Sequence, residues 1–132
     1  MIKLSELKPG DIVMTDFEGQ QREGVVTELN REDKEVCVDT DVQEFWFTPD
    51  HLFPILVNEE QLFKLGFSKL ENSDGSVKYM KGAFRVLIPR AGHFTDIEIW
   101  WREDHRHLHH RLHVHELQNH YLQMTKVELT PA

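Results

Sequence analysis

Apolar and polar residues alternate in short runs through the first half of the chain, and turn-forming residues separate the runs. Residues 8–11, Lys-Pro-Gly-Asp, have the composition of a tight turn, because proline presets φ and glycine accepts a positive φ. Runs with a period of two predict strands. These runs cover residues 12–14, 22–29, 35–39, 43–48 and 53–56, with one helical turn at 49–52. Such short strands joined by tight turns predict a five-stranded barrel, since closure removes exposed strand edges.

The pattern of this half resembles the SH3-like barrels, a group that includes Tudor-like and KOW-like modules. The residues that carry the resemblance are Gly-Asp-x-Val at 10–13 and Gly-Val-Val at 24–26. The resemblance covers about residues 8–57 and implies a barrel domain over residues 1–57, of a kind that binds peptides or nucleic acid. With Phe45 and Phe47 filling the barrel, Trp46 points outward. It then either contacts a partner or packs against the rest of the chain.

After residue 57 the pattern changes to a mixture of helix and strand signals. Asn58 is a typical helix N-cap and Gly66 a typical stop, so a short helix is expected over residues 59–65. Strands are predicted at residues 67–70, 77–80, 84–88 and 94–101. A longer helix from about residue 113 to 124 follows, with its apolar residues three and four apart on one face: Val114, Leu117, Tyr121 and Met124. Residues 58–132 are therefore expected to form an α+β domain, with this helix packed on an antiparallel sheet of four or five strands.

The last helix carries a second resemblance. Residues 114–121, Val-His-Glu-Leu-Gln-Asn-His-Tyr, resemble the C-terminus of small uncharacterised bacterial proteins that are often associated with prophages or mobile elements. In that family Val-His-x-Leu-Gln-Asn-x-Tyr precedes Leu-Thr, and residues 53–55 and 61–67 match upstream pieces. The positions that match the C-terminal pattern are His115, Leu117, Gln118, Asn119 and Tyr121. The family implies no activity, and the histidines of residues 105–113 lie outside its pattern.

Composition excludes several classes of function. The chain has 15 Lys and Arg against 23 Asp and Glu, a net charge of −8, so a nucleic-acid partner is disfavoured. The sequence contains no apolar run of the ~20 residues that a membrane helix needs and no N-terminal apolar leader, which favours a cytoplasmic protein with no membrane attachment. Cys37 is the single cysteine, so neither an intrachain disulfide nor a cysteine-based zinc site is expected.

Histidines are concentrated near the C-terminus, where seven of the nine fall between residues 105 and 120. His105, His107 and His109 alternate, so a strand would project all three from one face, as candidate ligands for Zn²⁺, Ni²⁺ or Cu²⁺. Side chains two apart on a strand are about 7 Å apart. Only two neighbouring histidines of the strand could then bind the same ion. A further ligand would have to come from another segment, and His93 and His51 are the candidates. The alternative is a solvated surface strand that binds Zn or Ni only adventitiously.

The helix histidines do not match a known catalytic spacing. His115 and His120 are five residues apart, about 140° around a helix, so they cannot share one ion as a His-Glu-x-x-His pair does. His113, Glu116 and His120 share a side of the helix, but the two histidines are about 10 Å apart along it. The sequence also lacks a Gly-x-Ser-x-Gly elbow and a glycine-rich phosphate loop. No catalytic residue is assigned, and the chain is not expected to be an enzyme.

These observations favour a non-enzymatic interaction or adaptor protein whose partner is an unidentified protein. They are also compatible with a homo-oligomer. Trp46 and Trp100 are the candidate partner contacts. The alternative is a transition-metal-binding or pH-responsive protein that uses His105, His107 and His109. No resident cofactor is expected beyond adventitious Zn or Ni.

Overall fold

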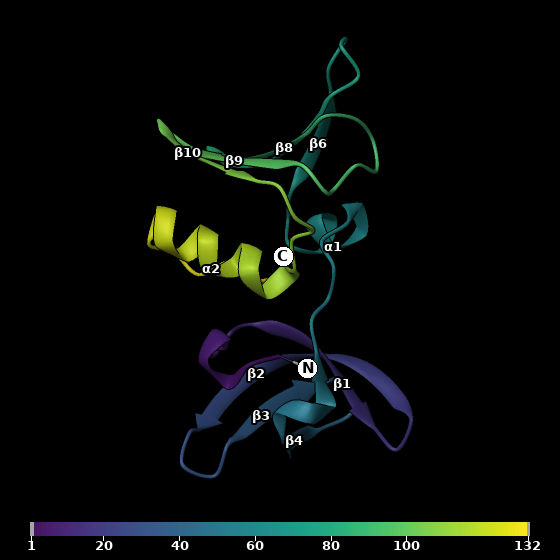
Figure 1. Ribbon diagram of the computed structural model, residues 1–132, viewed down its shortest axis with the longest axis vertical. Helices are drawn as coiled ribbons and strands as arrows, with labels where there is room; N and C mark the ends of the chain where they lie inside the picture. Colours follow the sequence, from purple (N-terminus) through teal and green to yellow (C-terminus); the bar gives the residue numbers. More distant parts are fainter. Residues whose placement is uncertain (1, 132) are drawn as a thin grey trace. The chain divides into compact units, whose positions relative to one another are not determined.

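The computed structural model describes residues 2–131 and has an α+β fold with two five-stranded antiparallel sheets and a C-terminal helix (Figure 1). The chain divides into two compact units, Met1–Ile55 and Leu56–Ala132. Each unit contains one of the sheets. Among the described residues, no helix combines the length and the apolar character that crossing a membrane requires.

The N-terminal unit is an antiparallel meander with one added strand. In chain order its elements are η1 (Leu4–Glu6), β1 (Ile12–Phe17), β2 (Gln20–Asn30), β3 (Glu35–Thr40), β4 (Glu44–Phe47), η2 (Pro49–His51) and β5 (Leu52–Phe53). The strand order in the sheet is β4-β3-β2-β1-β5. The predicted turn at residues 8–11 is present, with Gly10 at a φ of 97°. There the Asp11 carboxylate accepts hydrogen bonds from the Lys8 backbone N–H at 3.1 Å and from its Nζ at 2.8 Å.

The core of this unit lies on one face of the sheet, where alternate residues of the strands point inward. Its buried members are Ile2, Leu7, Val13, Val26, Val36, Val38, Phe47 and Leu52. Strand β3 approaches Gly24 of β2 closely, because an added Cβ there would lie 2.5 Å from Val38 Cγ1 and 3.0 Å from the Asp39 carbonyl oxygen. The register also shifts between Val26 and Glu28, and such bulges increase local twist. Glycine and bulge together curve the face that holds the core.

The sheet is not closed into a barrel by hydrogen bonds. The sequence predicts a closed barrel, whereas β4 and β5 are the two edges of the sheet and no strand pairing among the described residues joins them. The last strand is also shorter than expected, because residues 52–53 alone pair with β1. Strand β5 is thus a two-residue edge strand that follows a 3₁₀ turn, and so short a strand presents few backbone groups with which β4 could pair.

The C-terminal unit is a sheet with helices at its start and end. In chain order its elements are α1 (Glu59–Lys64), β6 (Ser68–Glu71), β7 (Val77–Lys81), β8 (Phe84–Ile88), β9 (Ile97–Trp101), β10 (Asp104–Leu108) and α2 (Val114–Thr125). The strand order β10-β9-β8-β7-β6 follows the chain. The predicted antiparallel sheet and C-terminal helix are confirmed. The predicted strand at 94–101 begins only at Ile97, and the histidine-rich segment forms the fifth strand, β10.

Helix α2 covers one face of this sheet (Figure 1). Val114, Leu117, Tyr121 and Met124 are buried, as their spacing predicts, and the rings of Tyr121 and Phe84 lie 4.7 Å apart. The helix begins where the Glu116 carboxylate accepts a hydrogen bond from the His113 backbone N–H at 2.9 Å, which satisfies one free N–H of a helix start.

The opposite face of the sheet is not covered by α2. On β9, Ile97 and Ile99 are buried, whereas Glu98 and Trp100 are only partly buried. The register of β9 with β10 pairs Trp100 with His105 and Glu98 with His107. Since residues paired across a ladder point to the same face, the strand histidines lie on the face that the helix leaves open.

Candidate functional site

A pocket of about 320 Å³ opens in the N-terminal unit, at one end of the curved face of its sheet. It lies between the β1–β2 turn and the β3–β4 turn. Its lining residues are Thr15, Phe17, Glu18, Gln20, Arg22, Thr40, Val42, Gln43, Phe45 and Phe47. These positions continue the inward-facing rows of the strands, so the pocket is the open end of the same interior that holds the core.

Three phenylalanines line this pocket from core to mouth. The exposed fraction rises from 7% for Phe47 to 41% for Phe45 and 50% for Phe17. The ring centroids are 5.9 Å apart for Phe45 and Phe47 and 5.4 Å apart for Phe17 and Phe45. Phe47 fills the interior, as the sequence predicts. Phe45 faces the same way but is half-exposed, because the interior opens at its level.

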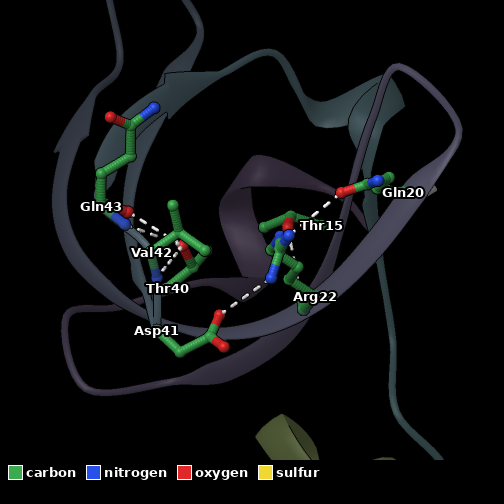
Figure 2. A network of polar contacts seen from close by, with 7 residues as sticks. All are labelled: Thr15, Gln20, Arg22, Thr40, Asp41, Val42 and Gln43. Carbon is green, nitrogen blue, oxygen red and sulfur yellow. Dashed lines mark hydrogen bonds and ion pairs between the residues drawn. The ribbon is translucent and has the colours of Figure 1, made fainter.

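Arg22 of β2 is bonded to groups of its own strand, of β1 and of the β3–β4 turn, as Figure 2 shows. Arg22 donates from Nη1 to Asp41 at 3.4 Å and from Nη2 to Gln20 Oε1 at 3.0 Å. Its own carbonyl accepts a hydrogen bond from Thr15 Oγ1 at 2.9 Å. The guanidinium is thus paired with the Gln20 amide of its own strand and with the Asp41 carboxylate of the β3–β4 turn.

The β3–β4 wall of the pocket is a turn held by Thr40. The Thr40 hydroxyl donates to the Gln43 carbonyl at 3.0 Å and accepts from the backbone N–H groups of Val42 and Gln43, each at 3.3 Å (Figure 2). This is a local side-chain turn of the kind threonine favours. It presents Val42, which is 61% exposed, at the rim of the pocket.

The negative net charge of the chain comes entirely from residues 1–55, the unit that contains the pocket. Residues 1–55 contain 5 Lys and Arg against 13 Asp and Glu, a difference of −8. Residues 56–132 contain 10 of each sign, so they have no net charge with neutral histidines. The pocket therefore lies in a strongly acidic unit.

The two predicted tryptophan contacts have different surroundings. Trp46 lies on β4, pairs with Cys37 across the ladder, and is 40% exposed. Its side chain points to the sheet face opposite that of Phe45, as alternation predicts. Trp100 is partly buried between two neighbours: the His105 ring stacks on it at 4.3 Å, and the Arg85 guanidinium lies 5.5 Å from its centroid.

The strand histidines are only partly brought together. His107 and His109 join Asp96 in a cluster, named here the Asp96–His107–His109 cluster, in which one ligand atom from each lies within 4.8 Å of the others. His107 Nε2 is 2.5 Å and His109 Nδ1 is 3.8 Å from Asp96 Oδ1. His105 is not a member of the cluster and instead lies 3.8 Å from Glu98. The other predicted helpers are elsewhere, His93 beside Arg90 and His51 beside Asp50.

Sequence reasoning missed Asp96, although the sequence contains a signal for it. The β9–β10 hairpin pairs Trp101 with Asp104 and Glu98 with His107. Continuing the same register by two residues places Asp96 opposite His109. The alternation that puts Asp96 on the face of Glu98 and Trp100 was readable, but the register depended on knowing that the histidine-rich segment pairs with β9.

The histidines of the last helix have contacts of their own. His113 Nδ1 lies 2.7 Å from Glu116, and His115 is buried with 1% exposure. His120 Nδ1 lies 2.7 Å from Arg106 Nη1. Burial, followed by the nearby Arg106 charge, lowers the pKa of His120. Among residues 2–131, none of these three belongs to a group of potential metal ligands.

No family model, curated protein or solved structure matches the chain. Functional inference therefore rests on the pocket and on the Asp96–His107–His109 cluster.

Proposed function

We propose that the N-terminal unit is a non-enzymatic binding module for an extended, basic segment of a partner protein. The observation that carries this proposal is the open aromatic pocket in an acidic unit. Phe17 and Phe45 expose 50% and 41% of their surface side by side. Apolar surface grouped in a hollow with polar groups at its edge is typical of ligand and peptide sites.

Charge favours a basic partner. The unit carries −8, and the one arginine of the pocket is already paired with Asp41. A segment rich in lysine or arginine would be drawn to this unit by long-range attraction. Its aliphatic stems or a neighbouring apolar side chain would cover the phenylalanine rings, and a cation over a ring face adds a favourable contact.

The edge of the sheet favours an extended partner. Strand β4 is an edge strand, and Glu44, Phe45 and Trp46 are all exposed. A segment that pairs with such an edge gains backbone hydrogen bonds. Because strand side chains alternate, it would reach the pocket beside Phe45 with one set of side chains and Trp46 with the other.

We also propose that this unit is an open relative of the SH3-like barrels. The strand order β4-β3-β2-β1-β5 and the 3₁₀ turn before the last strand support this. For the C-terminal unit, membership of the bacterial family with the Val-His-x-Leu-Gln-Asn-x-Tyr pattern stays a proposal. It is supported by the burial of Leu117, Gln118 and Tyr121, which are three of its matching positions.

A displayed library of random linear peptides, selected on the full chain, tests the binding function. Enriched peptides are expected to carry net positive charge and apolar residues at alternate positions. A labelled copy of one such peptide is then titrated with the protein, and its fluorescence anisotropy is recorded. Truncating an aromatic side chain at the centre of an interface commonly costs enough to weaken binding at least about tenfold, which is the loss expected for Phe45→Ala.

Phe63→Ala is the matched control, because Phe63 is 47% exposed on α1 of the other unit. It should leave the affinity unchanged. Enrichment of no peptide, enrichment of acidic peptides, or equal affinities for the wild type and Phe45→Ala would each overturn the proposal.

A further inference from the structure

We propose that the Asp96–His107–His109 cluster binds one transition-metal dication, with Zn²⁺ as the probe that tests it. The site lies on the sheet of the C-terminal unit, so it is independent of the peptide pocket. It replaces the sequence-based set of His105, His107 and His109 by exchanging one histidine for an aspartate.

The donor atoms are of the right kind and nearly in place. Zinc bonds to histidine nitrogen at about 2.0–2.1 Å and to carboxylate oxygen at about 2.0–2.2 Å. Two donors on one tetrahedral ion are therefore about 3.4 Å apart. The Asp96 Oδ1 distances of 2.5 Å to His107 Nε2 and 3.8 Å to His109 Nδ1 lie on either side of that value. Small side-chain rotations would open the short contact and close the long one around an ion.

The backbone holds two of the three donors in fixed positions. Asp96 lies between Phe94, which is 4% exposed, and Ile97, which is 0% exposed, so its backbone is fixed on both sides by buried residues. His107 lies inside β10 and pairs with Glu98 of β9. His109 follows the end of β10, and its side chain is 75% exposed, so it is the donor with most room to adjust.

A second carboxylate lies near the histidine donor, where a small movement would let it hydrogen-bond to the ring. Glu98 Oε1 lies 4.0 Å from His107 Nδ1, the ring nitrogen that does not face Asp96. A carboxylate on the far nitrogen of a ligating histidine fixes the orientation of the ring and strengthens it as a ligand. The same oxygen lies 3.8 Å from His105 Nε2, and stacking on Trp100 holds His105 beside it.

Charge and chemistry select the class of ion. Asp96 and Glu98 place two carboxylates beside the donors, which a dication would offset. Two imidazoles with one carboxylate suit Zn²⁺, Ni²⁺ or Cu²⁺, whereas Mg²⁺ and Ca²⁺ prefer an all-oxygen set. Asp96 and His109 are 48% and 75% exposed, so water can complete the coordination.

Isothermal titration of the tag-free full chain with ZnCl₂ is the test. One ion per chain is expected, with Asp96→Asn and His107→Gln each weakening binding by more than about tenfold. Glu98→Gln should weaken it about tenfold, the lower end of the effect of a supporting group on metal affinity. His110→Gln and His93→Gln remove histidines from the same unit but outside the cluster, and should leave the affinity unchanged.

Two further readouts separate a defined site from diffuse binding to a histidine-rich surface. Co²⁺ should give the visible absorption of a coordinated ion in the wild type and in His110→Gln, but not in Asp96→Asn. Added Zn²⁺ should raise the unfolding temperature of the wild type and not of Asp96→Asn, while circular dichroism checks that the metal-free variants fold. Binding in the millimolar range only, or equal losses in the cluster and control variants, would overturn the proposal.

Discussion

The rings of Phe17 and Phe45 lie 5.4 Å apart, although β2 and β3 stand between their strands in the sheet. In a flat sheet, β1 and β4 would be about 14 Å apart, because neighbouring strands are spaced at about 4.8 Å. The contact therefore measures how strongly the sheet curls. The contact between the two rings joins the two walls of the pocket, although β1 and β4 do not pair with each other in the sheet.

Gly24 should be required for this curl. The Cβ of Gly24→Ala would meet Val38 Cγ1 at 2.5 Å and the Asp39 carbonyl oxygen at 3.0 Å. Overpacking of this kind typically costs about 1–3 kcal/mol, to be measured as a lower free energy of unfolding in urea. Combining Gly24→Ala with Val38→Ala removes the closest clashing atom, so the double variant should lose less than the sum of the two. Strictly additive losses of unfolding free energy would show that the clash with Val38 is not what destabilises Gly24→Ala.

Phe45 and Phe47 should differ sharply in their contribution to stability. Phe47→Ala empties a position that is 7% exposed, and truncating such a core phenylalanine costs about 3–5 kcal/mol. Phe45 is 41% exposed at the pocket, so Phe45→Ala should cost about 1 kcal/mol or less, near the usual range for surface changes. Urea denaturation of both variants measures the difference. Similar losses would mean that Phe45 belongs to the core and is not a free binding surface.

His120 should make stability fall as pH is lowered. Burial, with the nearby Arg106 charge, lowers its pKa in the folded chain, whereas the unfolded chain takes up the proton at the ordinary value near 6.5. The unfolded state then binds more protons, so the contribution of His120 is complete above pH ~6.5 and is lost as pH falls through the folded pKa.

The measurement for His120 is the free energy of unfolding at pH 7.5 and at lower pH. His120→Gln should show a smaller loss on acidification than the wild type, because glutamine has no proton to gain. His51→Gln is the control, since His51 is exposed and is not among the groups that shift the pKa of His120; it should keep the wild-type pH dependence. An unchanged pH dependence in His120→Gln would contradict the assignment.

Cys37 should be almost inert toward thiol reagents in the folded protein. Its side chain is buried with 2% exposure on β3, and burial raises the pKa of the thiol while Glu44 adds to the effect. Because the thiolate is the reactive form, a chromogenic disulfide reagent should react slowly at neutral pH and rapidly after denaturation. Equal rates in the two states would mean that β3 and its neighbours open readily.

Local sequence patterns predicted the individual helices and strands better than they predicted whether the first sheet closes into a barrel. The spacing of Val114, Leu117 and Tyr121 is a property of one helix, and it identified the buried face of α2 correctly. Whether β4 meets β5 is a property of the whole sheet. It depends on the length of β5, and a run such as residues 53–56 does not show how many of its residues will pair.

The candidate site shows the same limit. Alternation correctly placed His105 and His107 on one strand face, but a metal site needs donors from a second segment. Asp96 was read as part of a strand, with no partner assigned to it. Only the register of β9 with β10 brings its carboxylate to His107 and His109. The phenylalanine pocket escaped notice because its rim is made of turns, where no periodic pattern exists to be read.

The division of charge between the two units has a consequence for how the protein responds to acid. Eight of the nine histidines lie in residues 56–132, which carry no net charge while they are neutral, and one lies in the unit with −8. Protons gained by histidines therefore add positive charge almost entirely to residues 56–132. The N-terminal unit stays acidic while the C-terminal unit changes from neutral to basic, so one chain would then combine two units of opposite net charge.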